Sequence, residues 1–502
     1  MSDRRAWAGL AVLVLPCLLI SMDISVLFFA LPFIAADLGP TGPEQLWIMD
    51  AYSFTLAGGL ITMGAVGDRV GRRKLLLLGA AAFSAASVAA AYAPTAELLI
   101  AARFLLGVAG ATLLPSTLSL IRTLFPDDAK RKVAIAVWTG GITIGAFIGP
   151  IAGGLLLEFF WWGSAFLINL PAMALLLALG PMLLPETRNP DAGRFDFPGA
   201  VLSMAAMLAV VYGMKKTAVE GVEPVPVAAL VLGLVLAVVF LRRQRRIAYP
   251  LVDLAMFGDR TFGTAIGINL VAMFCFIGSM MFTNQYLQLV LGMRPFEAAL
   301  WSLVVVPFIA VGMTVSGVLA QRLRIAPLVA GGLVVLASGF AALATLEVDS
   351  GLWVVLAGSG LVGAGVLVTT TLTGDHVLST APEEKVGSAS ALAETGTELG
   401  GALGMAVLGT VGAAVYHREM AGAVAGLPPE AAATAQDTLG GAAAVAAQTP
   451  GGEALFAAAE SAFVSGLTTT AVSAAVLVLV LTVPAYRALR KVPAPRREAV
   501  AA

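Results

Sequence analysis

Fourteen apolar stretches of 16 to 31 residues run through the 502 residues of this chain. A bilayer core about 30 Å thick needs about 20 residues of helix, and inside it a helix satisfies its own backbone hydrogen bonds. Only 12% of the residues are charged, against about 25% in a soluble domain. The sequence therefore predicts an all-α polytopic membrane protein. The predicted spans are 7–30, 45–66, 74–92, 96–122, 133–157, 162–184, 197–214, 226–241, 262–290, 297–320, 326–346, 352–374, 386–416 and 464–486.

Basic residues between the spans predict the orientation of the chain. With fourteen spans, most connecting Lys and Arg residues fall on one side, with clusters at 69–74, 130–132, 242–246 and 487–497. The other side receives Lys215, Lys216, Arg294 and Arg418. Cytoplasmic loops carry the excess of basic residues, so we expect both termini in the cytoplasm. Removing one span would break this alternation, which supports the count of fourteen.

A faint internal repeat predicts two related halves. The segment 64–73 after span 2 has a degraded counterpart at 317–324 after span 10, with Gln321 where Asp68 stands. Repeats with a solute site at their interface are typical of transporters. The predicted domains are an N-terminal six-helix bundle (1–190), two additional membrane helices (191–255), a C-terminal six-helix bundle (256–490) and a cytoplasmic tail (491–502).

One connection, 418–463 on the predicted outer side, is much longer than the others. It is rich in Ala and contains helix breakers at Pro428, Pro429 and 449–452. This pattern predicts two helical pieces joined by a turn. A solvated extracellular loop and a folded cap over the outer mouth both fit the pattern.

Four acidic residues lie within predicted spans, namely Asp23, Asp50, Glu394 and Glu398. A carboxylate at the membrane centre costs roughly 3 kcal/mol on insertion, so a chain that keeps four of them is expected to use them. At about 1.5 Å per residue, the two glutamates lie about 12 and 18 Å above the inner end of span 13. Asp23 and Asp50 lie about 10 and 7 Å below the outer ends of their spans. The four acids therefore need not form one cluster and can lie at several depths, and Asp50 can also be a water-exposed residue near the surface.

Glu394 and Glu398 are four residues apart and share one face of a helix. Two close carboxylates resist joint ionisation, so the pair can hold one proton and release it when a cation arrives. Arg103 is a permanent charge within span 4 and needs a carboxylate, a carbonyl or water beside it. It is interpreted as an electrostatic regulator of a carboxylate, with a purely structural ion pair as the alternative.

Two glycine-rich motifs stand out. The first combines glycines, which permit tight turns, with an acid embedded among arginines, and the alternative is an ordinary basic loop. It consists of Gly64, Gly67, Asp68, Arg69, Gly71, Arg72 and Arg73. The second lies in span 5 and places small residues on one helix face, where they serve plain helix packing, a flexible seam between the two halves, or both. It consists of Gly141, Gly145, Gly149, Pro150, Gly153 and Gly154.

Other side chains are candidates for lining a cavity that accepts cations. Aromatic faces and thioethers attract or tolerate cations, and amides supply hydrogen bonds. The candidates are Phe28, Asn269, Phe276, Met280, Asn284 and Gln288. The two Cys residues are interpreted as small buried hydrophobic residues, and the two His residues are too isolated to form a metal site. We expect neither a metal site, nor a nucleic-acid surface, nor catalytic machinery.

The motifs resemble those of the major facilitator superfamily. The 64–73 motif is similar to the signature between its second and third helices, and 103–107 resembles its proton-linked arginine motif. The segment 141–154 is similar to the antiporter motif, and 22–32 is similar to span 1 of the fourteen-span drug/proton antiporters. The segment 47–53 and the glutamate pair are similar to the multidrug efflux members of that family. The resemblance implies two six-helix bundles plus two central helices.

The resemblance also implies export of lipophilic, often cationic compounds in exchange for protons, without a cofactor. We expect such a pump in the bacterial inner membrane, as a monomer whose partners are protons, lipophilic cations such as ethidium and quaternary ammonium compounds, and the bilayer. Asp23 and the Glu394/Glu398 pair would couple protons to cations, with Asp50 tuning recognition near the exit. A dedicated exporter of one natural product is the alternative. A membrane sensor or scaffold fits less well, and an enzyme least.

Overall fold

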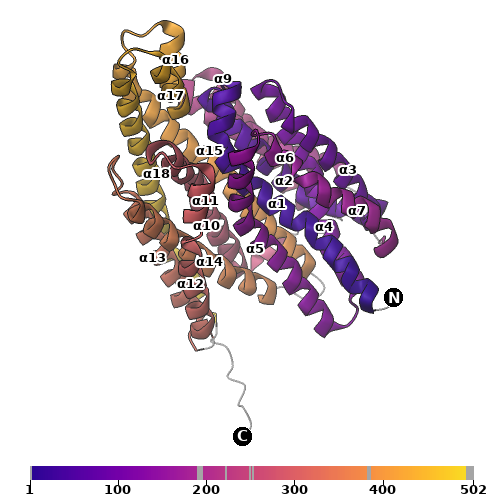
Figure 1. The fold of residues 1–502 in the computed structure, drawn as a ribbon. Coiled ribbons are helices and arrows are strands. Elements are labelled where there is room, and N and C mark those ends of the chain that lie inside the picture. The colour runs from indigo at the N-terminus through magenta and orange to yellow at the C-terminus, as the bar shows by residue number, and fades with distance from the viewer. Residues whose placement is uncertain are drawn as a thin grey trace. The chain divides into compact units, whose positions relative to one another are not determined.

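The computed structural model describes residues 3–188, 196–220, 223–247, 250–251, 254–320, 322–380 and 386–492. Every regular element in these ranges is helical, which confirms the all-α fold expected from the sequence (Figure 1). The predicted domain boundary at 190/191, most of the predicted tail 491–502, and Gln321 lie outside the described residues. Two compact units emerge: unit 1 comprises Met1–Val252 and Met293–Leu300, and unit 2 comprises Asp253–Gly292 and Trp301–Ala502.

The first nine helices belong to unit 1. They are α1 (Asp3–Leu38), α2 (Gly42–Val70), α3 (Arg72–Ala91), α4 (Ala96–Leu124), α5 (Asp128–Phe159), α6 (Ser164–Leu167), α7 (Asn169–Leu183), α8 (Phe197–Glu220) and α9 (Pro224–Gln244). After them come η1 (Leu254–Gly258), α10 (Arg260–Gln285), η2 (Tyr286–Val290), α11 (Pro295–Ser302), α12 (Val305–Ala320), α13 (Ile325–Leu343), α14 (Leu352–Thr380), α15 (Val386–Ala423), α16 (Pro429–Asp437), α17 (Leu439–Gln448) and α18 (Gly452–Leu489).

Thirteen stretches of the described chain are long and apolar enough to cross a membrane. The number is fourteen when the two parts of α2, bent by 47° relative to each other, count as one span. Several helices extend well past the predicted spans. At about 1.5 Å per residue, the 36 residues of α1 reach about 54 Å, well beyond a hydrocarbon core of about 30 Å. Hydropathy finds the apolar centre of such a helix and misses its polar ends.

The two units share one packing scheme. In unit 1, α1 packs on α5 and α7, α4 packs on α2 and α3, and α3 packs on α7. In unit 2, α10 packs on α15 and α18, α14 packs on α12 and α13, and α13 packs on α18. The closest approaches also correspond, because a Cβ at Gly145 of α5 would strike the backbone at Leu18 of α1, and one at Gly400 of α15 would strike the backbone at Leu270 of α10. Each unit is therefore a helical bundle built around the same pairings.

Two predicted continuous spans are broken in the structure. Span 162–184 divides at Ile168 into α6 and α7, and span 297–320 divides at 303–304 into α11 and α12. Each break lies just before a proline, Pro171 or Pro307. A proline has no N–H to donate to the carbonyl four residues earlier and disfavours helical backbone in the residue before it. Leu303 O instead accepts from the closer Val306 N–H, at 2.9 Å.

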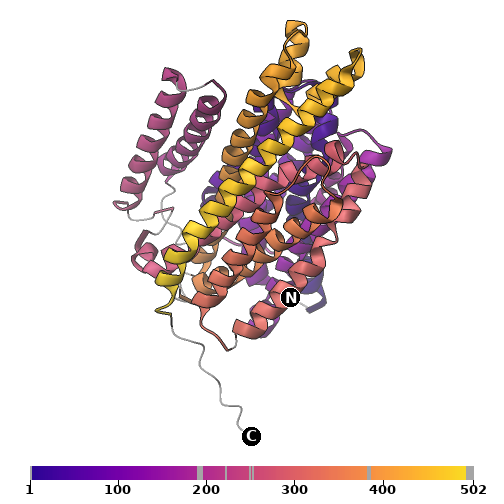
Figure 2. The same ribbon diagram turned by 90° about the vertical axis from the view of Figure 1, so that its left-hand side faces the viewer.

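The two additional helices α8 and α9 form a hairpin that packs on α2 through α8 (magenta in Figure 2). Their backbones approach closely, because a Cβ at Gly213 of α8 would lie 2.7 Å from Pro226 O of α9. The exposed residues of α9 include many valines and leucines, which a bilayer would cover. The hairpin is thus an extra membrane element attached to one side of unit 1.

A buried carboxylate fixes the end of this hairpin. Asp196 accepts hydrogen bonds from Arg243 Nε (2.8 Å), Gln244 Nε2 (2.9 Å) and the Gly199 N–H (3.0 Å). Burial alone would raise the pKa of Asp196, but the hydrogen bonds from Arg243, Gly199 and Gln244 outweigh burial and hold that pKa below its ordinary value. Gln244 Oε1 in turn accepts from the Leu251 N–H (2.6 Å). The start of α8 and the end of α9 are therefore held together.

The long connection predicted at 418–463 is largely helical. α15 runs on to Ala423 and α18 begins at Gly452, with α16 and α17 as a short helical pair between them (Figures 1 and 2). Tyr416 donates to Ala435 O (2.9 Å), and Gln436 donates to His417 O (3.1 Å). The segment therefore contains the two predicted helical pieces, and it is a folded element anchored to α15.

Candidate functional site

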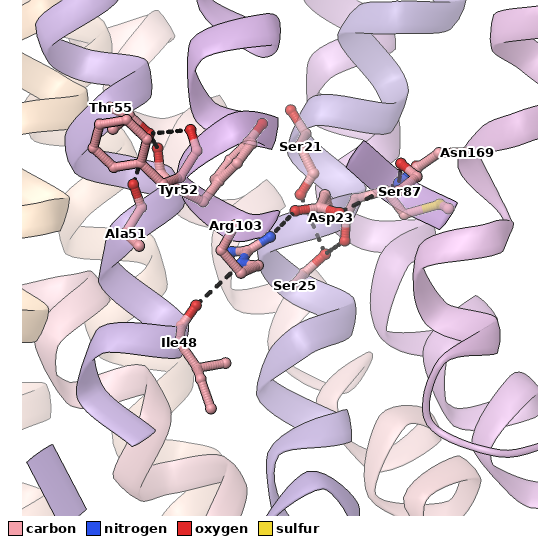
Figure 3. A network of polar contacts seen from close by, with 12 residues as sticks. Ser21, Asp23, Ser25, Ile48, Ala51, Tyr52, Thr55, Ser87, Arg103 and Asn169 are labelled. Atoms are coloured by element: carbon pink, nitrogen blue, oxygen red, sulfur yellow. Dashed lines mark hydrogen bonds and ion pairs between the residues drawn. The ribbon is translucent and has the colours of Figure 1, made fainter. Parts of the chain in front are cut away.

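Asp23 of α1 and Arg103 of α4 form an ion pair inside unit 1 (Figure 3). Both side chains are only 1% exposed. Burying two charges is costly, and removing one partner of a buried pair typically costs about 3–5 kcal/mol because the other charge is left alone. The sequence did not predict the neighbours of these two charges, and the structure shows that Asp23 and Arg103 are paired with each other.

α2 holds Arg103 in place. The Arg103 Nε donates to Ile48 O (3.0 Å), and the guanidinium carbon lies 4.6 Å from the centre of the Tyr52 ring. A Cβ at Gly107 of α4 would overlap Tyr52 O and the Thr55 hydroxyl, so only glycine lets α4 approach α2 this closely. The glycine four residues after the arginine thus places a carbonyl and an aromatic face against the charge. A cation–π contact of this kind is worth about 2 kcal/mol when desolvated.

Two polar partners complete the network, and both were missed at the sequence level. Asn169 Nδ2 donates to Asp23 Oδ1 (3.3 Å) and to Ser87 Oγ of α3 (3.4 Å). Asn169 and Ser87 are both fully buried. Asn169 is the first residue of α7, directly after the break ahead of Pro171. The sequence signal that could have identified Asn169 is a single Asn in an apolar run, two residues before a proline.

Asp50 lies on α2, two residues after Ile48, whose carbonyl binds Arg103. Its exposure is 0%, so the interpretation of Asp50 as a water-exposed residue near the surface is wrong. Unit 1 therefore buries Asp50 as well as Asp23.

Glu394 and Glu398 lie in unit 2, one helical turn apart on α15, and both are partly exposed. Thr397, between them, accepts a hydrogen bond from Asn269 of α10 (2.8 Å). A Cβ at Gly400 of α15 would meet the Leu270 backbone, which places α15 directly against α10. The structure thus assigns the paired aspartate to unit 1 and the glutamate pair to unit 2.

The motif after span 2 is almost entirely helical, which corrects its prediction as a loop. α2 continues to Val70 and α3 begins at Arg72, so Gly71 alone connects them, with φ of +113°. Asp68 pairs with Arg72 across this corner. A left-handed φ strains any residue with a side chain, and a Cβ here would also lie 2.5 Å from Glu186 Oε1.

Glu186, which follows α7, caps the start of α3 and was not predicted. Its carboxylate accepts from the backbone N–H groups of Arg73 (3.1 Å) and Lys74 (3.2 Å), and Arg73 Nε lies 3.6 Å from Glu186 Oε2. An acid at a helix N-terminus satisfies free N–H groups and complements the helix dipole. The Gly64–Arg73 motif thus connects α2, α3 and the end of α7. The other residues of the motif, Gly64, Gly67 and Arg69, lie on α2, with Arg69 in its last turn. A Cβ at Gly64 would lie 3.7 Å from Pro115 of α4, and one at Gly67 would contact Arg72.

The glycines of span 5 face α1 within unit 1. A Cβ at Gly141, Gly145, Gly149 or Gly153 would meet side-chain or backbone atoms of α1. Gly154 instead faces Pro295 and Phe296, and α5 continues through Pro150 without a break. The stripe is therefore a helix-packing surface inside unit 1.

The candidate cavity residues differ in their burial. Phe28, Asn269, Asn284 and Gln288 are buried, whereas Phe276 and Met280 are partly exposed. Among the described residues, Asn269 Oδ1, Asn284 Oδ1 and Gln288 Nε2 find no hydrogen-bond partner. Gln288 lies in η2, a π-helical turn, and such turns are frequent at functional sites.

Cys17 and Cys275 are buried, and neither forms a disulfide. Within the described ranges, no group of three or more His, Cys, Asp or Glu side chains is arranged to hold a metal ion.

Comparison with known proteins gives one consistent family. A model of the Major Facilitator Superfamily matches residues 14–405. The multidrug efflux pump LfrA of Mycolicibacterium smegmatis is 44% identical over 483 residues, or 95% of each chain. The methyl viologen resistance protein SmvA of Salmonella typhimurium is 35% identical over 81% of this chain and 82% of its own length. The tetracenomycin C resistance and export protein of Streptomyces glaucescens is also 35% identical, over 81% of this chain and 76% of its own.

Solved structures agree on the fold. A bacterial homologue of the human lysosomal transporter Spinster, in an inward-facing and unoccupied conformation, has a TM-score of 0.66 at 18% identity. The match covers 98% of this chain and 99% of that structure. Thirteen to fourteen spans and bacterial efflux relatives indicate a multi-pass protein of the bacterial inner membrane. With a family model over most of its length and close relatives over nearly all of it, this chain belongs to the major facilitator superfamily.

Proposed function

We propose that this protein is a proton-coupled multidrug efflux antiporter that exports lipophilic, often cationic compounds by alternating access. The observation that carries the proposal is the buried Asp23–Arg103 ion pair in a fold shared with multidrug efflux pumps. A buried carboxylate beside a permanent cation has two distinct states. It is ionised and paired, or protonated with its partner's charge uncompensated.

The coupling follows from the charges. While Asp23 is ionised, the pair is neutral and binds α1 to α4. When a proton loads, Asp23 no longer compensates Arg103, which keeps its contacts with Ile48 O and with the Tyr52 and Phe166 rings. The two protonation states therefore favour different helix arrangements, and a ligand shifts such an equilibrium only through a difference in affinity for the states. The proton gradient is the driving force, and the cycle needs no cofactor.

The glutamate pair supplies the cation side of the exchange. Glu394 and Glu398 are adjacent on α15 and only partly buried, so they carry up to two negative charges that attract a lipophilic cation. The buried amides of Asn269, Asn284 and Gln288 on the neighbouring α10 and η2 add hydrogen-bonding groups for polar substituents. Asp50 tunes recognition from within unit 1. The protein acts as a monomer with both termini in the cytoplasm.

A dedicated exporter of one natural product is the second candidate. Its support is the 35% identity to a protein named for resistance to and export of tetracenomycin C. The relative named as a multidrug pump is more similar, at 44% over nearly the whole chain, and therefore favours the multidrug function. A panel of dyes, quaternary ammonium compounds and antibiotics separates the two, because a dedicated exporter would move one compound class only.

The test is proton-driven ethidium transport in inverted membrane vesicles. Acidifying the interior should drive ethidium uptake by the wild-type protein, and a protonophore should abolish it. Asp23→Asn should remove the dependence on the gradient, and Glu398→Gln should reduce ethidium uptake about 10-fold or more, as expected for the loss of a charged interaction. Unchanged gradient-driven transport in both variants, at equal protein levels, would refute this assignment of the acids.

A further inference from the structure

Asn169 has an unusual position in the Asp23 network. It is fully buried at the first residue of α7, and its Nδ2 group donates to both Asp23 Oδ1 and Ser87 Oγ (Figure 3). Its other polar atom, Oδ1, has no hydrogen-bond partner among the described residues. Buried amide oxygens are nearly always paired in proteins, so this atom calls for an explanation.

The chemistry of the amide offers one. An Asn side chain carries donors on nitrogen and an acceptor on oxygen, and half a turn about the Cβ–Cγ bond exchanges them. Toward an ionised carboxylate, which only accepts, the nitrogen must face Asp23, as it does in the structure. A protonated carboxyl group has an O–H to donate, and an amide oxygen is the partner it needs. The Oδ1 atom without a partner is thus the atom that a proton on Asp23 would satisfy.

We propose that Asn169 is a positioning residue that responds to the protonation state of Asp23. It donates from Nδ2 while Asp23 is ionised and paired with Arg103, and it turns to accept the Asp23 O–H at Oδ1 once Asp23 is protonated. The proton comes from water on the loading side, forms an O–H bond on Asp23, and returns to water on the other side. In the turned state the Ser87 hydroxyl donates a hydrogen bond to the same Oδ1. This inference rests on the proposed proton coupling at Asp23.

The neighbours of Asp23 differ in whether they can accept a hydrogen bond from its protonated form. Arg103 is a permanent donor and cannot accept the Asp23 proton. Two titratable residues of α2 are close in sequence to Ile48, namely Asp50 and Tyr52, and the Tyr52 ring lies against Arg103. Asp23 accepts from Arg103 and from Asn169, and of these two groups the Asn169 amide can both donate and accept.

The break in span 6 makes the position possible. A continuous helix would fix residue 169 within regular backbone, whereas here Asn169 opens a new helix after Ile168. Pro171, two residues later, prevents the two pieces from joining with standard hydrogen bonding. The polar side chain is therefore placed by a backbone feature on a helix that packs against both α1 and α3.

The experiment compares the pH profile of ethidium transport in vesicles between the wild-type protein and Asn169→Leu. The leucine side chain has a volume similar to that of asparagine and no polar atoms. The substitution removes a donor from the ionised state and an acceptor from the protonated state, and the bond to the charged group is the stronger of the two. The midpoint of the pH profile should therefore move to higher pH by about one unit. Gradient-independent ethidium exchange should fall much less than gradient-driven transport. Ser84→Ala, on the same helix as Ser87 but bonded to Ala80 O (2.8 Å), is the control and should keep the wild-type profile.

The outcomes separate this inference from the proposed function. If the wild-type protein shows no gradient-driven transport, or Asp23→Asn transports normally, proton coupling at Asp23 is wrong. If Asp23→Asn abolishes coupling while Asn169→Leu keeps the wild-type midpoint and rate, the role of Asn169 is wrong. Should Asn169→Leu fail to fold, as judged by aggregation in detergent, Asn169→Ser takes its place. Its hydroxyl is too short to replace the amide, so it should show the same upward shift, and a wild-type profile would overturn the proposal.

Discussion

Arg103 makes three kinds of contact from one guanidinium: an ion pair with Asp23, a hydrogen bond to Ile48 O, and a stacking contact with Tyr52. These contacts need a planar group that donates in several directions at once. An ammonium is a compact point charge on a flexible stem and cannot reproduce this geometry. The identity of this residue, beyond its charge, therefore determines how α1, α2 and α4 are joined.

This leads to a prediction for Arg103→Lys. The variant keeps the positive charge but loses the Ile48 hydrogen bond and part of the ring contact, together worth about 1–2 kcal/mol. We expect gradient-driven ethidium transport to fall roughly 10-fold at equal protein levels. Vesicle assays normalised to protein amount measure it. Activity equal to wild type would show that charge alone matters at this position.

The sequence predicted which side chains carry charge in the membrane, but not how they pair. Asp23, Asp50, Arg103 and the glutamates stand out because charges are costly in lipid. The meeting of Asp23 with Arg103 depends on the rotation of α1 against α4, and a single sequence does not encode that rotation in any local pattern. Asn169 and Ser87 escaped notice because an uncharged polar residue in a span is common, and their burial arises only from packing.

At the level of helices, glycine determines which pairs approach closely. A Cβ at Gly145 of α5 would collide with the Leu18 backbone of α1, whereas one at Gly140, also on α5, would meet nothing within 4 Å. The two positions share a helix and differ in environment, and therefore form a matched pair.

Gly145→Ala should destabilise the protein by about 1–3 kcal/mol, because the backbone of α1 must move to accommodate the methyl group. Gly140→Ala should be neutral or stabilise by up to about 1 kcal/mol, because alanine favours helix and meets no neighbour. Thermal unfolding in detergent compares the two. Equal effects would show that α1 and α5 do not pack as closely as described.

The α8–α9 hairpin gives a pH-dependent prediction. The pKa of Asp196 is held below its ordinary value of about 4, so its ionised form stabilises the folded protein at pH above that value. The contribution is lost as pH falls through the lowered folded-state pKa. Asp196→Asn should therefore be less stable than wild type at pH 7, by about 1–2 kcal/mol, with the difference shrinking below about pH 4.

Thermal unfolding of the two proteins in detergent between neutral and acidic pH measures this difference. The control is Glu419→Gln, which removes an exposed carboxylate on α15 and should match wild type throughout. A stability difference between Asp196→Asn and wild type that stays constant down to pH 3 would contradict the role of Asp196.

Hydropathy predicted the number and order of the membrane helices, because about 20 apolar residues are a strong signal. It did not predict the breaks before Pro171 and Pro307, because a hydropathy window measures side-chain polarity and ignores a missing N–H. It also placed a loop where α2 continues to Val70, because charged residues lower hydropathy whether or not the backbone is helical. The helix ends and breaks are therefore the least predictable parts of the fold.

For the whole molecule, the positive-inside pattern predicts cytoplasmic termini, and the α16–α17 pair on the outer side follows from the count of spans. Both native cysteines are buried, so a single introduced cysteine reports its own location. A membrane-impermeant maleimide should label Ala433→Cys, an exposed site in α16, on intact cells. Arg490→Cys, exposed just after α18, should react only after the cells are permeabilised. The reverse pattern would invert the predicted topology.

α15 and α18 each continue for 38 residues, or about 57 Å, and are joined by the short α16–α17 pair. Because two helices of this length are joined at one end, a small tilt of either helix would produce a large displacement of that end. A tilt of about 10° around the middle of α15 would carry its end sideways by roughly 5 Å, given that rise per residue. A tilt of the helix that carries the glutamate pair would therefore also move the end of that helix, which lies far from the two charges. A spin label or fluorophore at that tip would report any tilt of α15 from a position far along the helix from the glutamate pair.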